Sequence, residues 1–314
     1  MSRLEASDTN TKGILLKVIS VVFFVLMAAL IKESSKMVPA GEAVFFRSFF
    51  ALPIIFGWLW LSGHIASGLK VVSFFDHFWR GLVGTLAMAF MFLGLGLLPL
   101  PEVTAISYSA PILTVVFAAA ILREKVRLIR FTAVFMGFIG VLIILYPRLS
   151  VISVEQKFSF EARGALYVLL GATFMALAHI FIRKLTKTET ASAIVFYFTI
   201  SSCFWSALTV PFGWVIPNMF TFGILLLAGL LGGFGQIFLT TAYKYSEASM
   251  VAPFEYISIL FAIVLGYFVF GELPTLTVLV GSLVVISAGI LIIWREHRLG
   301  VERTRNKINL SLTA

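Results

Sequence analysis

The residues of this chain that could do chemistry are a few polar side chains placed inside long apolar runs. Glu255 lies about six residues into one run, beside Pro253 and Tyr256. It could bind a ligand, carry a proton or make an interfacial hydrogen bond. Arg47 lies about two turns into another run. It could meet an anion, or it could bind helix carbonyls or a glutamate such as Glu102.

Two tyrosines stand near prolines in otherwise apolar runs. Tyr108 and Tyr256 each occupy the opening turns of a run that also contains a proline, Pro111 or Pro253. Proline loosens a helix, which is tolerated in a membrane only where the backbone faces protein or a cavity. The pattern predicts that these two runs line a cavity and that their prolines are helix breaks; the alternative is an interfacial aromatic belt.

Further polar residues could contact a ligand or tether helices by hydrogen bonds. His179 and Gln236 lie late in two other runs, and tethering is the alternative role for each of them. The hydroxyls beside Tyr108 could supply hydrogen bonds to a ligand. The candidate binding residues are Tyr108, Ser107, Ser109, Tyr256, Glu255, Gln236, His179 and Arg47.

Enzyme motifs are missing from the sequence. There is no HExxH, GxSxG or Walker A pattern, and the two aspartates, Asp8 and Asp76, lie outside the apolar runs. This excludes an aspartyl intramembrane protease and a nucleotide-driven pump. The single cysteine, Cys203, excludes an intrachain disulfide and a zinc cluster. We therefore expect no enzyme activity, no cofactor and no metal.

The composition is that of a membrane protein. Hydrophobic residues make up 60% of the 314-residue chain, charged residues only 12%, and the mean hydropathy is +1.02. A soluble domain carries about 25% charged residues, because water must hydrate its surface. The net charge of +9 is spread between apolar runs, so it predicts membrane topology and argues against nucleic-acid binding.

The apolar runs predict an all-α integral membrane fold with ten transmembrane helices. A helix needs about 20 mostly apolar residues to cross the bilayer. The first run is kept as a helix because no small-residue cleavage site of a signal peptide follows it. The predicted spans are 14–35, 41–62, 79–98, 102–122, 128–147, 163–185, 191–212, 219–243, 249–270 and 275–294.

Charge predicts the orientation. With the N-terminus inside, eighteen Lys and Arg residues, Lys17 and Arg80 among them, fall on cytoplasmic segments and five on external ones. Positive residues concentrate on the cytoplasmic side of membrane proteins. We expect a multi-pass protein of the cell inner membrane with both termini cytoplasmic.

The two halves of the chain resemble each other. Residues 13–23 align with 164–174, and Tyr108 then falls on Tyr256. Five helices per half is an odd number, so equivalent loops must lie on opposite sides of the bilayer. The loop at 123–130 is basic, whereas its mate at 271–275 has no Lys or Arg, as inversion requires.

Two inverted five-helix repeats are typical of alternating-access transporters, whose substrate site lies near the midplane between the halves. Glycines at close-packing spacing predict a tight bundle, at Gly81 and Gly84, Gly137 and Gly140, and Gly229 and Gly233. The predicted organisation is a cytoplasmic segment 1–12, a first repeat 13–147, an external linker 148–162, a second repeat 163–294 and a basic tail 295–314.

Ordered motifs extend this interpretation. They are Ala43-Val-Phe-Phe-Arg47, Pro99-Leu-Pro-Glu-Val-Thr-Ala105 with Pro111, Arg123-Glu124, and Val251-Ala-Pro-Phe-Glu-Tyr256 leading to Phe270-Gly-Glu272. With these motifs the chain resembles the drug/metabolite transporter superfamily, with two EamA-type domains over nearly its whole length. The resemblance implies ten helices, cytoplasmic termini and small organic metabolites as substrates.

Within the superfamily the chain is similar to the branch of bacterial riboflavin importers and S-adenosylmethionine importers. Phe46-Arg-Ser-Phe-Phe-Ala-Leu-Pro53 and Arg80-Gly-Leu-Val-Gly84 resemble the riboflavin branch most. The resemblance therefore implies riboflavin uptake, with export of amino acids or related metabolites, or S-adenosylmethionine uptake, as alternatives. The expected partners are a small metabolite and the lipid bilayer, with no nucleic acid; a homodimer stays open.

Overall fold

The structure is a computed structural model in which every described segment with regular structure is helical. No strand occurs among the described residues, as the sequence predicts for an all-α protein. The structure describes residues 3–61, 63, 69–121, 128–149, 160–185, 188–245, 252–291 and 294.

The helices follow the apolar runs. Two 3₁₀ segments, η1 (Val210–Phe212) and η2 (Ala252–Ile257), lie between α-helices, and a last helix covers Leu276–Leu291. The α-helices are α1 (Arg3–Ser34), α2 (Ala40–Leu61), α4 (Phe74–Leu95), α5 (Leu100–Ser107), α6 (Ser109–Ile121), α7 (Leu128–Leu149), α8 (Phe160–Leu185), α9 (Ala191–Ala207), α10 (Met219–Tyr245) and α12 (Ser258–Phe270).

Ten apolar segments of the described chain match the ten predicted spans. Six are long and apolar enough to cross a membrane, and the others are shorter apolar helices. Large apolar side chains stay exposed on the outside of the bundle, for example Trp60 at 73%, Phe268 at 78% and Leu283 at 65%. Contiguous exposed apolar surface of this kind suits contact with lipid. The protein is a multi-span membrane protein.

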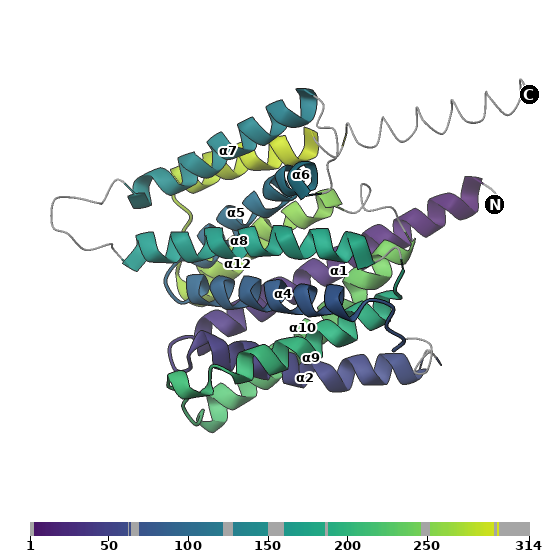
Figure 1. Ribbon diagram of the computed structural model, residues 1–314. Coiled ribbons are helices and arrows are strands. Elements are labelled where there is room, and N and C mark those ends of the chain that lie inside the picture. The colour runs from purple at the N-terminus through teal and green to yellow at the C-terminus, as the bar shows by residue number, and fades with distance from the viewer. Residues whose placement is uncertain are drawn as a thin grey trace, which may run out of the picture.

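The helices pack as one bundle (Figure 1). Helix α1 packs along α10, α4 packs along α8, and α2 lies against both α9 and α10. Helix α7 and the last helix lie together at one edge, and α2 lies at the opposite edge. Between these edges, α1, α5 and η2 each contact α12, and α1 also contacts α5 and η2. Of these segments, α5 carries Ser107, and η2 carries Glu255 and Tyr256.

Glycines lie at the closest helix contacts, as their spacing predicts. A Cβ on Gly140 would lie 2.9 Å from the carbonyl of Gly281, and one on Gly281 would lie 2.8 Å from the carbonyl of Gly140. A Cβ on Gly229 would lie 3.2 Å from the carbonyls of Phe46 and Arg47 in α2. Larger side chains at these positions would push the helices apart.

Two helix starts lie earlier than predicted. Helix α4 begins at Phe74 and not near residue 79, because the side chain of Ser73 accepts the backbone N–H of Asp76 and caps the helix. The prediction that 74–78 belong to a connection is therefore wrong. Helix α1 begins at Arg3, before its apolar run.

Two predicted spans are interrupted. The run at 102–122 forms α5 and α6, which are separated at Tyr108. The run at 249–270 begins, in its described part, with the 3₁₀ turns of η2 and continues as α12. Glu255 therefore lies in a 3₁₀ segment and not inside a regular α-helix. These interruptions are the local irregularities that position the site.

Candidate functional site

Two interrupted helices meet in the buried core, and one tyrosine hydroxyl joins them. The Tyr108 hydroxyl donates to the carbonyl of Tyr256 at 3.2 Å and lies 2.6 Å from the Ser258 hydroxyl. It accepts the backbone N–H of Ile259 at 3.0 Å. Helix α12 starts after Ile257, whose apolar side chain cannot cap a helix. Tyr108 supplies the missing acceptor from another segment.

The two predicted tyrosines also pack ring against ring. The centroids of Tyr108 and Tyr256 are 5.0 Å apart at an interplanar angle of 78°, the edge-to-face arrangement that aromatic pairs favour. Both rings are buried. Gly289 of the last helix makes room for the Tyr256 ring, because a Cβ there would collide with it. The structure thus brings the two pseudo-equivalent residues into direct contact.

An ion pair lies beside the tyrosines. Glu255 of η2 pairs with Lys17 of α1. The Lys17 side chain is 3% exposed, whereas the Glu255 side chain is 48% exposed. Lys17, which the charge count placed on a cytoplasmic segment, is therefore buried among the helices, and its position inside the first apolar run was the signal. The carboxylate keeps surface on which a ligand could bind.

Two more ionisable groups extend this cluster. His179 of α8 is exposed and lies close enough to Glu255, Lys17 and Arg80 to interact with them electrostatically. These groups come from four segments, α1, α4, α8 and η2. Arg80 of α4, counted as a cytoplasmic charge from the sequence, is 6% exposed and so is also buried in the bundle.

The remaining candidates are placed differently. Arg47 of α2 is 4% exposed, and its Nε has no hydrogen-bond partner among the described residues. The ion pairs found between described residues do not include one between Arg47 and Glu102. The Ser109 hydroxyl is buried without a partner in the described chain. Ser107 bonds a carbonyl of its own helix at 2.7 Å, and Gln236 is half-buried on α10.

The predicted helix breaks occur close to the two prolines but not at them. The first break is at Tyr108, and Pro111 lies in the first turn of α6. Proline is tolerated there because the first N–H groups of a helix have no intrahelical acceptor. Pro253 lies within the 3₁₀ segment η2, before the start of α12. Both prolines therefore stand where a new helical segment starts.

At one end of the bundle, an ion pair joins three segments. Lys32 at the end of α1 pairs with Glu272 at 2.9 Å. The other carboxylate oxygen of Glu272 accepts the backbone N–H of Leu100 at 2.8 Å, and Lys32 donates to the carbonyl of Leu98 at 2.6 Å. These contacts tie α1, the start of α5 and the turn after α12 together.

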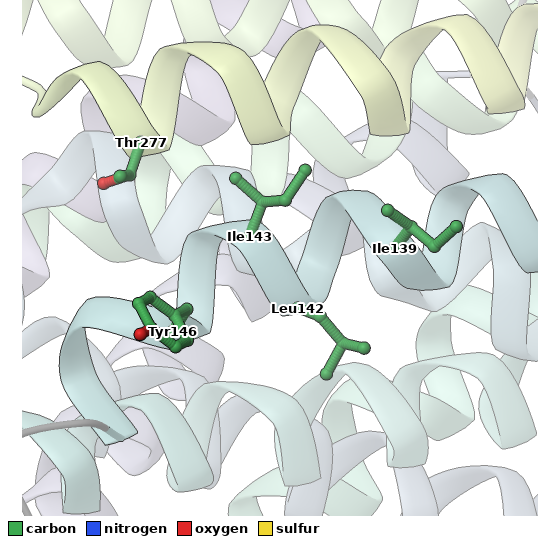
Figure 2. Close-up of a pocket in the computed structure, with 5 residues that line it drawn as sticks. All are labelled: Ile139, Leu142, Ile143, Tyr146 and Thr277. Atoms are coloured by element: carbon green, nitrogen blue, oxygen red, sulfur yellow. The ribbon is translucent and has the colours of Figure 1, made fainter.

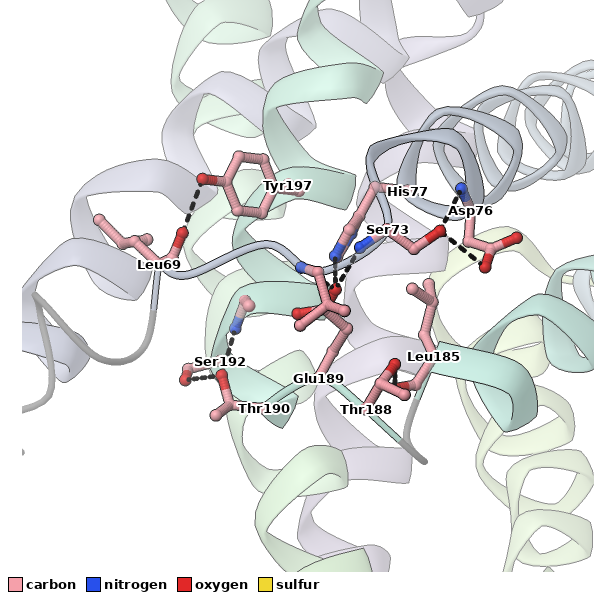
Figure 3. Close-up of polar contacts among 12 residues, drawn as sticks. Leu69, Ser73, Asp76, His77, Leu185, Thr188, Glu189, Thr190, Ser192 and Tyr197 are labelled. Carbon is pink, nitrogen blue, oxygen red and sulfur yellow. Dashed lines mark hydrogen bonds and ion pairs between the residues drawn. The ribbon is translucent and has the colours of Figure 1, made fainter.

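Polar contacts also gather at the start of α4, at the other end of the bundle (Figure 3). The carboxylate of Glu189, in the connection between α8 and α9, accepts the backbone N–H groups of Val72 and Ser73 at 2.7 and 3.0 Å. Asp76 pairs with Lys184 of α8 at 2.7 Å. No local sequence pattern marks Glu189 or Lys184 as an interaction partner. Both ends of the bundle are thus held by charged side chains on short connections.

A groove on the outer surface is apolar and lies away from these groups (Figure 2). It is lined by Ile139, Leu142, Ile143 and Tyr146 of α7 and by Thr277 of the last helix. Its side chains suit lipid contact and offer few polar groups to orient a metabolite. Among the described residues no group of three or more His, Cys, Asp and Glu could hold a metal ion.

Comparison with known sequences identifies a family. The model of the EamA-like transporter family matches residues 11–146 and 162–295. The S-adenosylmethionine uptake transporter of Rickettsia prowazekii is 27% identical over 294 residues, covering 94% of this chain and 96% of that protein. The pseudopaline exporter of Pseudomonas aeruginosa is 29% identical over 287 residues, covering 90% and 95%.

Two further matches agree with these. An uncharacterized transporter of Helicobacter pylori is 27% identical over 300 residues, covering 91% of this chain and 95% of its own. One crystal structure, titled only as that of a protein, superposes on this chain with a TM-score of 0.61. The superposition covers 95% of this chain and 99% of the other. At 17% identity this likeness shows the fold alone.

Proposed function

The chain belongs to the EamA-like transporter family, and from this premise we propose that it moves a small organic metabolite across the bacterial inner membrane by alternating access. The observation that carries the proposal is the meeting of two interrupted helices at Tyr108 and Ile259, beside the accessible carboxylate of Glu255. Secondary transporters bind their substrates at discontinuous helices near the midplane, between their repeats.

The same proposal includes two inverted repeats, 13–147 and 163–294, joined by the linker 148–162. The family matches two successive segments of the chain, which supports a repeat. The charge asymmetry between equivalent loops supports inversion, and the excess of basic residues on one side supports cytoplasmic termini. In this arrangement Tyr108 and Tyr256 are equivalent residues that meet between the repeats.

The first candidate substrate is S-adenosylmethionine, taken up into the cell. The similarity to the Rickettsia prowazekii transporter over 94% of this chain supports it. The sequence resemblance favoured riboflavin as the substrate. The names of these two relatives give S-adenosylmethionine and pseudopaline, so they do not support riboflavin. The second candidate is export of a metabolite, which the similarity to the pseudopaline exporter supports.

The test is transport into liposomes that contain the purified full-length protein. Radiolabelled S-adenosylmethionine, riboflavin and a mixture of amino acids are offered separately, with protein-free liposomes as the control. Saturable S-adenosylmethionine uptake that excess unlabelled compound abolishes is the expected result. If only riboflavin or only an amino acid enters, that compound takes the place of S-adenosylmethionine as the proposed substrate. If none of the three enters faster than into protein-free liposomes, the substrate candidates fail.

Alternating access is tested in the same liposomes. Preloading with unlabelled compound should accelerate entry of the labelled one, because an alternating-access carrier returns loaded faster than empty. Equal rates with and without preloading, for every substrate that enters, would contradict alternating access.

A further inference from the structure

Two buried arginines have no carboxylate partner in the described part of the chain. Arg47 of α2 is 4% exposed and Arg80 of α4 is 6% exposed. The Nε of Arg47 and the Nε and Nη1 of Arg80 are buried without any hydrogen-bond partner among the described residues. The described ion pairs include neither arginine. Such groups are rare inside a membrane protein and mark functional sites.

The packing around the two guanidinium groups holds them in place. The Arg80 guanidinium lies over the ring of Phe198 in α9, with Cζ 3.9 Å from the ring centroid. Gly84, one turn further along α4, leaves room for it, because a Cβ there would collide with Nη1 of Arg80. Nε of Arg47 packs against Gly232 of α10, where a Cβ would lie 2.9 Å away.

The two positive charges lie close to each other. Arg47 and Arg80 are near enough to interact electrostatically, and Arg47 interacts in the same way with Cys203 of α9. Arg80 therefore packs on Phe198 of α9, and Arg47 lies within electrostatic reach of Arg80 and of the same helix. Burying two like charges without an anion costs several kcal/mol for each. An anion between them would remove this cost, and the planar fork of arginine fits a carboxylate with two parallel hydrogen bonds.

The charge changes sign across the bundle. Arg80 interacts electrostatically with His179, and His179 in turn interacts with Glu255. Arg47 and Arg80, which have no carboxylate partner among the described residues, thus lie at one end of this row. The Glu255 carboxylate, which is 48% exposed and also pairs with Lys17, lies at the other end. A metabolite that carries a carboxylate at one end and a cationic group at the other would complement both ends.

We propose that Arg47 and Arg80 form a subsite for the carboxylate of the transported metabolite, and that Glu255 faces its cationic group. The inference rests on the proposed transport function and narrows its substrate to carboxylate-bearing, zwitterionic metabolites. A neutral substrate without an acidic group would leave both arginines uncompensated. Arg80 acts here together with Arg47, the only member of the pair that the sequence marked as a candidate.

The experiment compares two probes that differ in one carboxylate. S-adenosylmethionine and its decarboxylated analogue share the adenosine, the sulfonium and the amine. Their affinities are measured on the purified full-length protein from the rise in unfolding temperature with ligand concentration. The wild-type protein is expected to prefer the carboxylate form by about tenfold or more. In the double variant Arg47→Gln/Arg80→Gln this preference should fall to about one.

Two further variants keep the test decisive. Lys36→Gln removes a positive charge from an exposed ion pair with Glu33 and should leave the preference unchanged. If the double variant does not fold, Arg80→Lys replaces it. Lys keeps the charge but loses the fork, so the preference should fall although the net charge does not. A preference that survives in whichever variant folds would overturn the subsite.

Failure of the substrate candidate gives a different result. If neither probe binds, sodium sulfate is compared with sodium chloride at equal ionic strength. Sulfate should then raise the unfolding temperature of the wild type and of Lys36→Gln more than chloride does, and should lose this advantage in the arginine variants. An equal response of wild type and arginine variants would overturn the anion subsite, whatever the transported compound is.

Discussion

The Tyr108 hydroxyl accepts the backbone N–H of Ile259 at 3.0 Å, so a tyrosine between α5 and α6 caps α12. A cap normally comes from the residue just before its own helix. Here it comes from a residue about 150 positions earlier in the chain. The contact makes the start of α12 depend on the position of the first interrupted helix.

Tyr108→Phe tests this cap. The substitution keeps the ring and its contact with Tyr256 but leaves the Ile259 N–H without its acceptor. The free energy of unfolding should fall by about 1–3 kcal/mol, the usual effect of an unpaired buried donor. Thermal unfolding of the purified protein measures it. Tyr146→Phe, which removes a hydroxyl from a ring that is 72% exposed on the outer surface, is the matched control; an equal loss in both variants would contradict the cap.

A double-mutant cycle tests the ion pair between Lys17 and Glu255. Glu255→Gln leaves the buried Lys17 charge without its partner and should destabilise the protein by about 3 kcal/mol or more. Lys17→Met leaves a carboxylate that is 48% exposed and should cost less. The double variant should lose less than the sum of the two, because it leaves no unpaired charge. Denaturation of all four proteins in the same detergent gives the coupling energy. A coupling energy near zero would show that the contact does not stabilise the fold.

Glu255→Gln also tests proton coupling. An accessible carboxylate inside the bundle could take up a proton on one side and release it on the other. If it does, Gln, which cannot titrate, should abolish the dependence of the remaining transport on an imposed pH gradient. The overall transport rate should fall as well, because Glu255 is also proposed to face the cationic group of the substrate. Transport is compared in liposomes with and without the gradient. The same gradient dependence in wild type and variant would assign Glu255 to binding or structure.

The ion pair at the end of the bundle predicts a local effect. Glu272→Gln removes the charge opposite Lys32 and weakens the acceptor for the Leu100 N–H. We expect faster hydrogen exchange at the start of α5 and in the turn after α12. Glu33→Gln, which breaks the exposed pair with Lys36, is the control and should change exchange only around itself. Unchanged exchange at Leu100 in Glu272→Gln would contradict the predicted tie between these segments.

Gly289 should tolerate no side chain while Tyr256 keeps its place. A Cβ at Gly289 would collide with the Tyr256 ring, whereas one at Gly223 meets nothing within 4 Å. Gly289→Ala should therefore lower the unfolding temperature and weaken transport, because Tyr256 packs on Tyr108. Gly223→Ala, inside α10, should be neutral or stabilising by up to about 1 kcal/mol. A neutral Gly289→Ala would show that the ring can move aside at little cost.

The sequence predicted the helical class and the ten apolar segments, because the hydrophobic period and length of a membrane span depend only on local residues. It also singled out Tyr108 and Tyr256, which the structure brings into contact. It missed how they meet, since a hydrogen bond between residues about 150 positions apart has no local pattern. It also missed that the breaks lie at Tyr108 and before Ser258 and not at the prolines.

The charged residues near helix ends were the hardest to assign. Lys17 and Arg80 lie close to the edges of their apolar runs, so counting loop charges placed both in the cytoplasm. The structure buries both, because neighbouring helices cover them. Positive-inside counting reads sequence position only, and it cannot tell a snorkelling residue from one that faces another helix. The distance of each residue from the start of its helix would have distinguished these buried residues from snorkelling ones. For Arg80 that start is marked by the N-cap Ser73.

Cys203 is the single thiol of the chain, and it is half-buried on α9, within electrostatic reach of Arg47. A spectroscopic or alkylating reagent directed at sulfhydryls will therefore report on one known position beside the arginine pair. A cysteine-free variant of the protein needs only one substitution. Single cysteines for labelling can then be introduced at chosen positions of α5, η2 or α12. The protein thus carries its own probe of when, and from which side of the bilayer, its interior becomes accessible.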